Sequence, residues 1–152
     1  MKKFLLLSAL VIAVLWSFAG CKQDEGGGFT VSGAVTIEPP ISSGESETLD
    51  IAMDTSSADF ATAASTGDLS VIDHYVAITV PDRANWAAFE FNGVKEGTYH
   101  LGGSIDIDGD GEYTDGDYYG SYADVDPMSG TPVLEVSDDN LNANFRVEEM
   151  GE

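Results

Sequence analysis

Apolar and polar residues alternate along most of the chain beyond residue 28, and this alternation predicts β-strands. In residues 29–37 every second position is apolar or glycine, and Thr and Ser dominate the positions between. A period of two is typical of a half-buried strand, and Pro39 and Pro40 predict its end because proline cannot donate to a β-ladder. Comparable apolar patterns predict further strands at residues 49–53, 71–80, 86–91, 99–105, 118–122 and 141–147.

The segments between these strands contain turn-forming residues and no long helical pattern. Residues 93–97 predict a turn, whereas residues 55–69, rich in Ser, Thr, Ala and Asp, fit either a long loop or one helical turn near residues 60–64. The pattern predicts a single all-β domain over residues 29–148, an antiparallel β-sandwich of about seven strands. Residues 149–152 are expected to form a short tail.

Two short motifs in this domain resemble those of the carboxypeptidase-regulatory-like, or prealbumin-like, β-sandwich family. The first is VSGAV at residues 31–35, and the second is FNGVKEGTY at residues 91–99, directly before a predicted strand. Members of that family usually serve as accessory, binding or spacing modules. The resemblance therefore implies a sandwich fold and a non-catalytic role.

The first twenty residues have the features of a secretory signal. Lys2 and Lys3 form a basic start, residues 4–15 are an apolar run, and small residues precede Cys21. These three features together are typical of a cleaved export signal. The apolar run is shorter than the roughly 20 residues that a membrane-spanning helix needs.

The residues FAGC that end at Cys21 resemble the lipobox of bacterial lipoproteins, although Phe18 stands where that family prefers Leu. The resemblance implies cleavage before Cys21, lipidation of its thiol and anchoring in a membrane. Cys21 is the only cysteine of the chain, so an intramolecular disulfide is excluded. Residues 21–28 end in three glycines and predict a flexible tether. In enterobacterial lipoproteins Asp after the cysteine signals inner-membrane retention, so Lys22 here favours the outer membrane or cell surface.

The charge balance limits the partners of the protein. The chain has 27 acidic and 6 basic residues, a formal net charge of −21. A binding face for nucleic acid needs clustered Lys and Arg, and the basic residues beyond residue 20 are scattered, at Lys22, Arg83, Lys95 and Arg146. Nucleic-acid binding is therefore excluded, whereas cation binding is favoured.

One acidic segment, DIDGDGEYTDGD, resembles the calcium-binding loop of the EF-hand family. Calcium takes six to eight oxygen ligands, and carboxylates at alternate positions converge when the chain curls around the ion. Glycine at position six permits the sharp turn. Positions one, three, five, six and twelve of the loop are Asp106, Asp108, Asp110, Gly111 and Asp117.

The resemblance also implies roles for two other residues of this loop. Glu112 would bind through its backbone carbonyl and Thr114 through a water molecule. Asp117 is one methylene shorter than the Glu usual at that position, and strands rather than helices are predicted on both sides. We therefore expect a structural calcium site on a β-hairpin, not a calcium switch, and magnesium fits less well because it demands octahedral geometry. The alternative interpretation is a solvated acidic turn, since Asp and Gly are common turn residues.

The aromatic residues have two interpretations. Four tyrosines in or just after the loop form a candidate ligand platform that could stack on sugar rings, or they pack against the sheet with their hydroxyl groups at its rim. Trp86 has apolar neighbours and is expected in the core. The four tyrosines are Tyr113, Tyr118, Tyr119 and Tyr122.

The sequence contains no recognisable local catalytic motif. His74 and His100 are expected to have packing or surface roles, since each stands alone in a predicted strand. We therefore expect a non-enzymatic, lipid-anchored binding or structural module, stabilised by calcium, whose partner is an unidentified protein or glycan. The alternatives are a calcium-assisted carbohydrate-binding protein and, with less support, a hydrolase.

Overall fold

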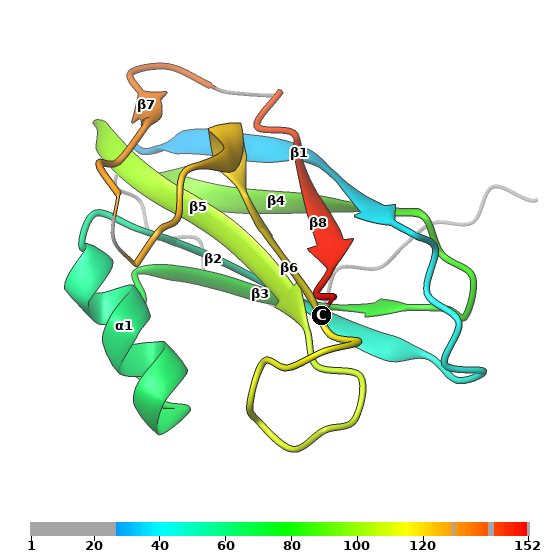
Figure 1. Cartoon of the computed structure of the whole chain (residues 1–152). Coiled ribbons are helices and arrows are strands. Elements are labelled where there is room, and N and C mark those ends of the chain that lie inside the picture. The colour runs from blue at the N-terminus through cyan, green and yellow to red at the C-terminus, as the bar shows by residue number, and fades with distance from the viewer. Residues whose placement is uncertain (1–26, 129, 140–141, 152) are drawn as a thin grey trace, which may run out of the picture.

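The computed structural model describes residues 27–128, 130–139 and 142–151 (Figure 1). The described chain is rich in strands and contains one α-helix, α1 (Ser57–Thr66), with two short 3₁₀ helices, η1 (Leu69–Val71) and η2 (Tyr122–Asp124). The strands are β1 (Phe29–Glu38), β2 (Glu47–Asp54), β3 (His74–Val80), β4 (Trp86–Val94), β5 (Gly97–Ile105), β6 (Tyr118–Ser121), β7 (Leu134–Val136) and β8 (Phe145–Glu149).

The all-β class predicted from the sequence is confirmed, but the strand arrangement differs from the expected antiparallel sandwich. The strands follow the order β3-β2-β5-β6-β8-β1-β4, with β7 paired to β5. The sheet is mixed, because β1 and β8 run parallel while the other pairs are antiparallel. The edge strands β3 and β4 contact each other, so one continuous sheet rolls around the core.

The expected alternation places one face of each long strand in the core. In β1, Val31, Val35 and Ile37 are fully buried. In β4, the side chain of Phe89 is 5% exposed whereas that of Trp86 is 62% exposed. The prediction that Trp86 lies in the core is therefore wrong: Trp86 has the same parity as the outward positions of β4, and the buried residues Ala87 and Phe89 lie on the opposite face.

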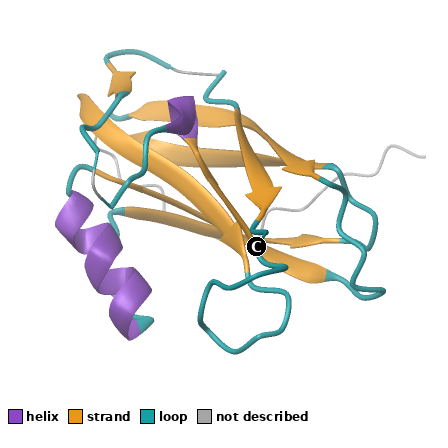
Figure 2. Cartoon of the chain, viewed as in Figure 1, coloured by secondary structure: helices purple, strands orange, loops and turns teal. Residues whose placement is uncertain are grey.

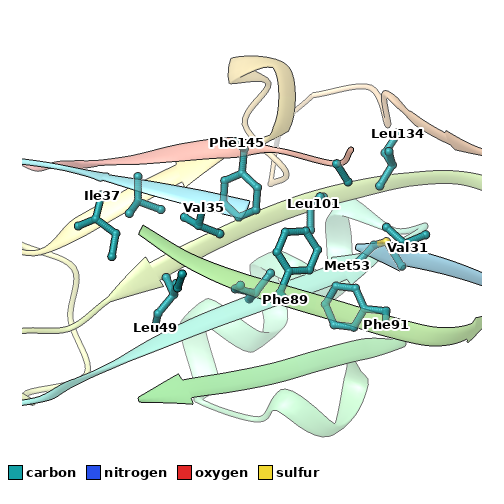
Figure 3. Close-up of a cluster of buried hydrophobic side chains, with 14 of the residues drawn as sticks. Val31, Val35, Ile37, Leu49, Met53, Phe89, Phe91, Leu101, Leu134 and Phe145 are labelled. Atoms are coloured by element: carbon teal, nitrogen blue, oxygen red, sulfur yellow. The ribbon is translucent and has the colours of Figure 1, made fainter. Parts of the chain in front are cut away.

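A single apolar core fills the interior of the rolled sheet (Figure 3). The rings of Phe89 and Phe145 meet edge to face with centroids 5.9 Å apart, and Phe91 lies 5.6 Å from Phe89. Such aromatic pairs add about 0.5–1.5 kcal/mol to the hydrophobic burial. The contacts join β4 to β8, which are far apart in the sequence.

Residues 55–69 contain a helix, α1, that is longer than the single turn near residues 60–64 offered as one of the two interpretations (Figure 2). It begins after Ser56, whose hydroxyl accepts a hydrogen bond from the N–H of Asp59, and it ends at Gly67 with φ of 68°. The N–H of Gly67 donates to the carbonyl oxygen of Ala63. Phe60 on this helix contacts His100 of β5 edge to face, at 6.1 Å between ring centroids, so α1 lies against the outer surface of the sheet.

The expected signal, lipidated cysteine and tether lie almost entirely outside the described residues, and so does Leu141 of the last predicted strand. The predicted strand at residues 141–147 is observed as β8 from Phe145, while β7 carries no sequence pattern long enough to predict it. In the part of the chain that the structure describes, no helix combines the length and the apolar character needed to span a membrane.

Candidate metal centre

The acidic loop connects β5 to β6, as expected for a site on a β-hairpin (Figure 2). Its two ends are held together because Ile105 of β5 pairs with Tyr118 of β6. Neither of these flanking elements is a helix, so the fold lacks the helix pair of an EF-hand at this position. Gly111, at position six, has φ of 81°, a conformation that favours glycine.

Aspartate side chains curl the first half of the loop by accepting hydrogen bonds from its backbone. Asp106 accepts from the N–H groups of Gly109 at 2.7 Å and Gly111 at 2.9 Å. Asp108 accepts from the N–H of Asp110 at 3.2 Å. Such local bonds are characteristic of aspartate in turns, and they bring the start of the loop back towards its end.

Asp117 closes the loop from the other side. Its side chain is buried, and its two oxygens accept hydrogen bonds from the N–H groups of Ile107 at 2.8 Å and Thr114 at 2.7 Å. The N–H of Met150, directly after β8, donates to the backbone carbonyl of Asp117 at 2.7 Å. Asp117 therefore links the beginning, middle and end of the loop to the last strand.

These bonds bring three carboxylates together. Asp106, Asp108 and Asp117 each offer an oxygen atom, and these atoms lie within 4.8 Å of one another. Like charges at such distances repel, and a cation bound between them would remove the repulsion. The predicted ligand Asp110 lies outside this triad, and its side chain accepts a hydrogen bond from the N–H of Glu112 at 2.7 Å.

The pKa of Asp108 reports this crowding. The N–H of Asp110 lowers that pKa by hydrogen bonding, but partial desolvation and the charges of Asp110, Asp117 and Asp106 together outweigh it, so the pKa is raised above its usual value. The environment therefore disfavours an isolated negative charge at Asp108 and favours any positive charge beside it.

The other predicted ligands remain predictions. Glu112 and Thr114 are both exposed, and the contacts of Thr114 involve its backbone: its N–H bonds Asp117 and its carbonyl accepts from the N–H of the same residue at 3.1 Å. The structure therefore supports a site for a metal ion at the acidic triad without identifying the metal.

The structure divides the four tyrosines of the predicted platform. Tyr118 is in the core and Tyr122 packs against it, whereas Tyr113 and Tyr119 line one cavity on the outer surface. The strand β6 places Tyr118 and Tyr119 on opposite faces, so adjacent aromatics in the sequence cannot share one platform. This division removes two of the four residues on which a sugar-stacking surface was expected.

Both histidines pack against aromatic rings, as expected. The ring of His74 lies 5.9 Å from Phe91 and 6.1 Å from Tyr99, while that of His100 contacts Phe60. Burial lowers the pKa of each histidine. Neither residue belongs to the acidic triad.

Asp54 is a buried residue that belongs to none of the motifs predicted from the sequence. Its side chain is 1% exposed and accepts hydrogen bonds of 2.7 Å from the N–H groups of Ser56 and Asp73. It therefore joins the end of β2 to the starts of α1 and β3. Its spacing from Ser56, the cap of α1, is the signal that could have revealed it.

No known protein family, curated protein or solved structure matches the chain. The fold and the site alone define its class: an all-β protein that carries an acidic, metal-competent loop on a β-hairpin.

Proposed function

We propose that the protein is an exported bacterial lipoprotein, anchored through Cys21, that acts as a non-enzymatic binding or spacing module and binds one stabilising calcium ion. The observation that carries the calcium part is the convergence of Asp106, Asp108 and Asp117 within 4.8 Å. The membrane anchor rests on the sequence of residues 1–21.

Several properties of the loop favour calcium over other metals. The donors are carboxylate oxygens, which hard cations prefer, and no histidine or cysteine joins them within the described residues. Three carboxylates converge among the described residues, so water and backbone oxygens would complete the six to eight ligands of calcium. Comparable extracellular sites have Kd values of about 10⁻⁴–10⁻³ M, and we expect that range here.

The position of the loop favours a structural role for the ion. Asp117 connects the loop to β6 through the chain and to the residue after β8 through the bond from Met150. A cation at the triad would therefore restrain two neighbouring strands of the sheet. We expect calcium to stabilise this end of the molecule rather than to open a new surface.

The calcium test compares melting temperatures and binding heats in calcium, in magnesium and in sodium chloride at matched ionic strength. We expect one calcium per chain and a stabilisation of about 2.7 kcal/mol at a hundredfold excess over Kd. Asp106→Asn combined with Asp108→Asn should abolish both effects. Asp115→Asn, which removes a charge from the same loop outside the triad, is the matched control and should retain them. Calcium stabilisation that survives in the double variant would rule out the triad as the site.

The anchor is tested separately by the mass of the protein recovered from bacterial membranes. We expect cleavage before Cys21 and a mass increase that corresponds to attached acyl chains. Cys21→Ser should leave the protein without this modification and release it from the membrane fraction. An unmodified wild-type cysteine would contradict the lipoprotein assignment and leave the calcium result untouched.

A further inference from the structure

A cavity of about 220 Å³ lies on the outer surface of the sheet, and both helix α1 and the acidic loop contribute to its lining. Its floor comes from β2 and β5, and its walls come from α1, β3, β6 and the loop. It is separate from the acidic triad, although the loop supplies Tyr113 and Gly111 to its lining.

The strand register places small side chains at the floor of this cavity and large side chains at its walls. Across β3, β2 and β5, Tyr75 pairs with Ala52 and Ala52 pairs with Gly102. In the neighbouring row Asp50 pairs with Ser104, and Ser104 pairs with Tyr119 of β6. Alanine, glycine and serine at the centre leave space, while the tyrosines stand at either side.

Tyr113 reaches this floor from the acidic loop. The hydroxyl of Ser104 donates a hydrogen bond to the Tyr113 hydroxyl at 2.9 Å. Because Ser104 lies between Asp50 and Tyr119 in the register, this bond holds the end of Tyr113 close to both residues. Phe60 of α1 adds a fourth aromatic ring to the lining.

The described lining of the cavity carries negative charge and no positive charge. Asp50 is the charged residue of its lining, which contains no Lys, Arg or His among the described residues. The hydroxyl of Tyr75 donates a hydrogen bond to Asp50, and burial, this hydrogen bond and the charge of Asp50 raise the pKa of Tyr75, so this tyrosine stays neutral. The faces of aromatic rings attract cations, and the attraction grows when the cation is desolvated.

We propose that this cavity binds a small organic ammonium group, quaternary or alkylated, with Asp50 as counter-charge and the rings of Tyr75, Tyr113, Tyr119 and Phe60 around the alkyl groups. Apolar walls favour such a cation over a strongly hydrated metal ion. An organic ammonium group would be the ligand of the binding module proposed above. This inference rests on the proposed function only for the statement that the protein is a binding module.

The experiment titrates the protein by NMR with choline and with 3,3-dimethyl-1-butanol, a neutral molecule of the same shape. We expect choline to shift the amide resonances of Gly102 and Gly103 and to bind about tenfold more tightly than the alcohol, which corresponds to about 1.4 kcal/mol. Titrations in EDTA and in calcium separate this site from the metal site, because the cavity should select choline under both conditions.

Three variants complete the test. Asp50→Asn keeps the shape and should weaken choline binding about tenfold, and Tyr113→Leu should weaken it about three- to tenfold, with little effect on the alcohol. Glu135→Gln removes one charge from β7, away from the cavity, and should change neither affinity. Retention on phosphatidylcholine vesicles would identify a lipid headgroup as the source of the ammonium group, and its absence a free solute.

Equal affinity for choline and the alcohol would overturn the proposal. The same conclusion would follow if choline bound unchanged to both Asp50→Asn and Tyr113→Leu, or if its shifts mapped away from the cavity. Triad variants that lose calcium binding but still select choline would support the proposal, because the cavity is lined by other residues than the acidic triad.

Discussion

At the scale of single residues, two aspartates of the same loop lie in opposite environments. Asp117 is 2% exposed and satisfies two backbone N–H groups, whereas Asp108 is exposed and surrounded by other carboxylates. Removing a buried acceptor costs more than removing an exposed charge that its neighbours repel. The two residues should therefore respond differently to substitution.

We predict that Asp117→Ala lowers the free energy of unfolding by about 1–3 kcal/mol in EDTA, because the N–H groups of Ile107 and Thr114 lose their acceptor. Urea denaturation followed by circular dichroism measures this change. Asp108→Asn is the matched control and should leave the protein as stable as the wild type or more so, since it relieves repulsion within the triad. Equal destabilisation by both substitutions would contradict this division of roles.

At the scale of elements, β4 shows how the face of a strand on which an aromatic side chain lies decides how much that side chain contributes to stability. Phe89 and Trp86 belong to the same strand, but Phe89 contacts Phe91 and Phe145 in the core while Trp86 faces outward. Both side chains are large and aromatic, so their different exposure to solvent separates their contributions to stability.

We predict that Phe89→Ala costs about 3–5 kcal/mol of unfolding free energy, because it leaves a cavity in the core. Trp86→Ala should change the stability by less than about 0.5 kcal/mol, since most of that side chain is already in solvent. Thermal or urea unfolding of the two variants provides the comparison. A large loss from Trp86→Ala would mean that this face of β4 is covered.

Helix α1 and β5 enclose His100, whose pKa is lowered by burial although the charges of Asp54 and Asp126 act in the opposite direction. A histidine with a folded-state pKa below its usual value binds fewer protons in the folded than in the unfolded state. Its contribution to stability is complete above the unfolded-state pKa of 6.5 and is lost as the pH falls through the folded-state pKa.

We therefore predict that the unfolding free energy of the wild type decreases as the pH is lowered below about 6.5. The substitution His100→Asn should reduce the slope of this dependence by up to one proton, about 1.4 kcal/mol per pH unit. Urea titrations between about pH 5 and pH 8 give the slopes. His74, whose pKa burial also lowers, keeps part of the dependence in the variant. An unchanged slope would show that His100 is equally protonated in both states.

At the scale of the whole molecule, negative charge dominates the electrostatics. The formal net charge is −21, whereas the ion pairs among the described residues are exposed, such as Arg146 with Glu38 at 3.4 Å and with Glu148 at 2.9 Å. Exposed pairs of this kind contribute about 0–1 kcal/mol each. Salt screens both the repulsion between carboxylates and the attraction within these ion pairs. We expect the repulsion to be the larger of the two effects.

We predict that raising the sodium chloride concentration from about 0.02 to 0.5 M increases the melting temperature by a few degrees, because the Debye length shortens and the carboxylates repel less. Potassium chloride should have the same effect, which separates general screening from specific ion binding. A melting temperature that falls with salt would show that the ion pairs contribute more than the repulsion costs.

The sequence by itself determined the local features of this protein. The period of two located most strands because alternate side chains of a strand always point to opposite faces, and the spacing of Asp106, Asp108 and Asp117 with Gly111 located the loop because bonds between near neighbours form its turns. The excess of acid, which favours cations, is a property of composition alone.

Only the tertiary structure decided which distant segments meet. The parallel pairing of β1 with β8, the outward position of Trp86, the separation of Tyr118 from Tyr119 and the cavity under α1 all depend on strand partners and register. Local patterns do not specify these choices, because the free energy that selects them comes from burying the faces of strands against partners far away in the sequence.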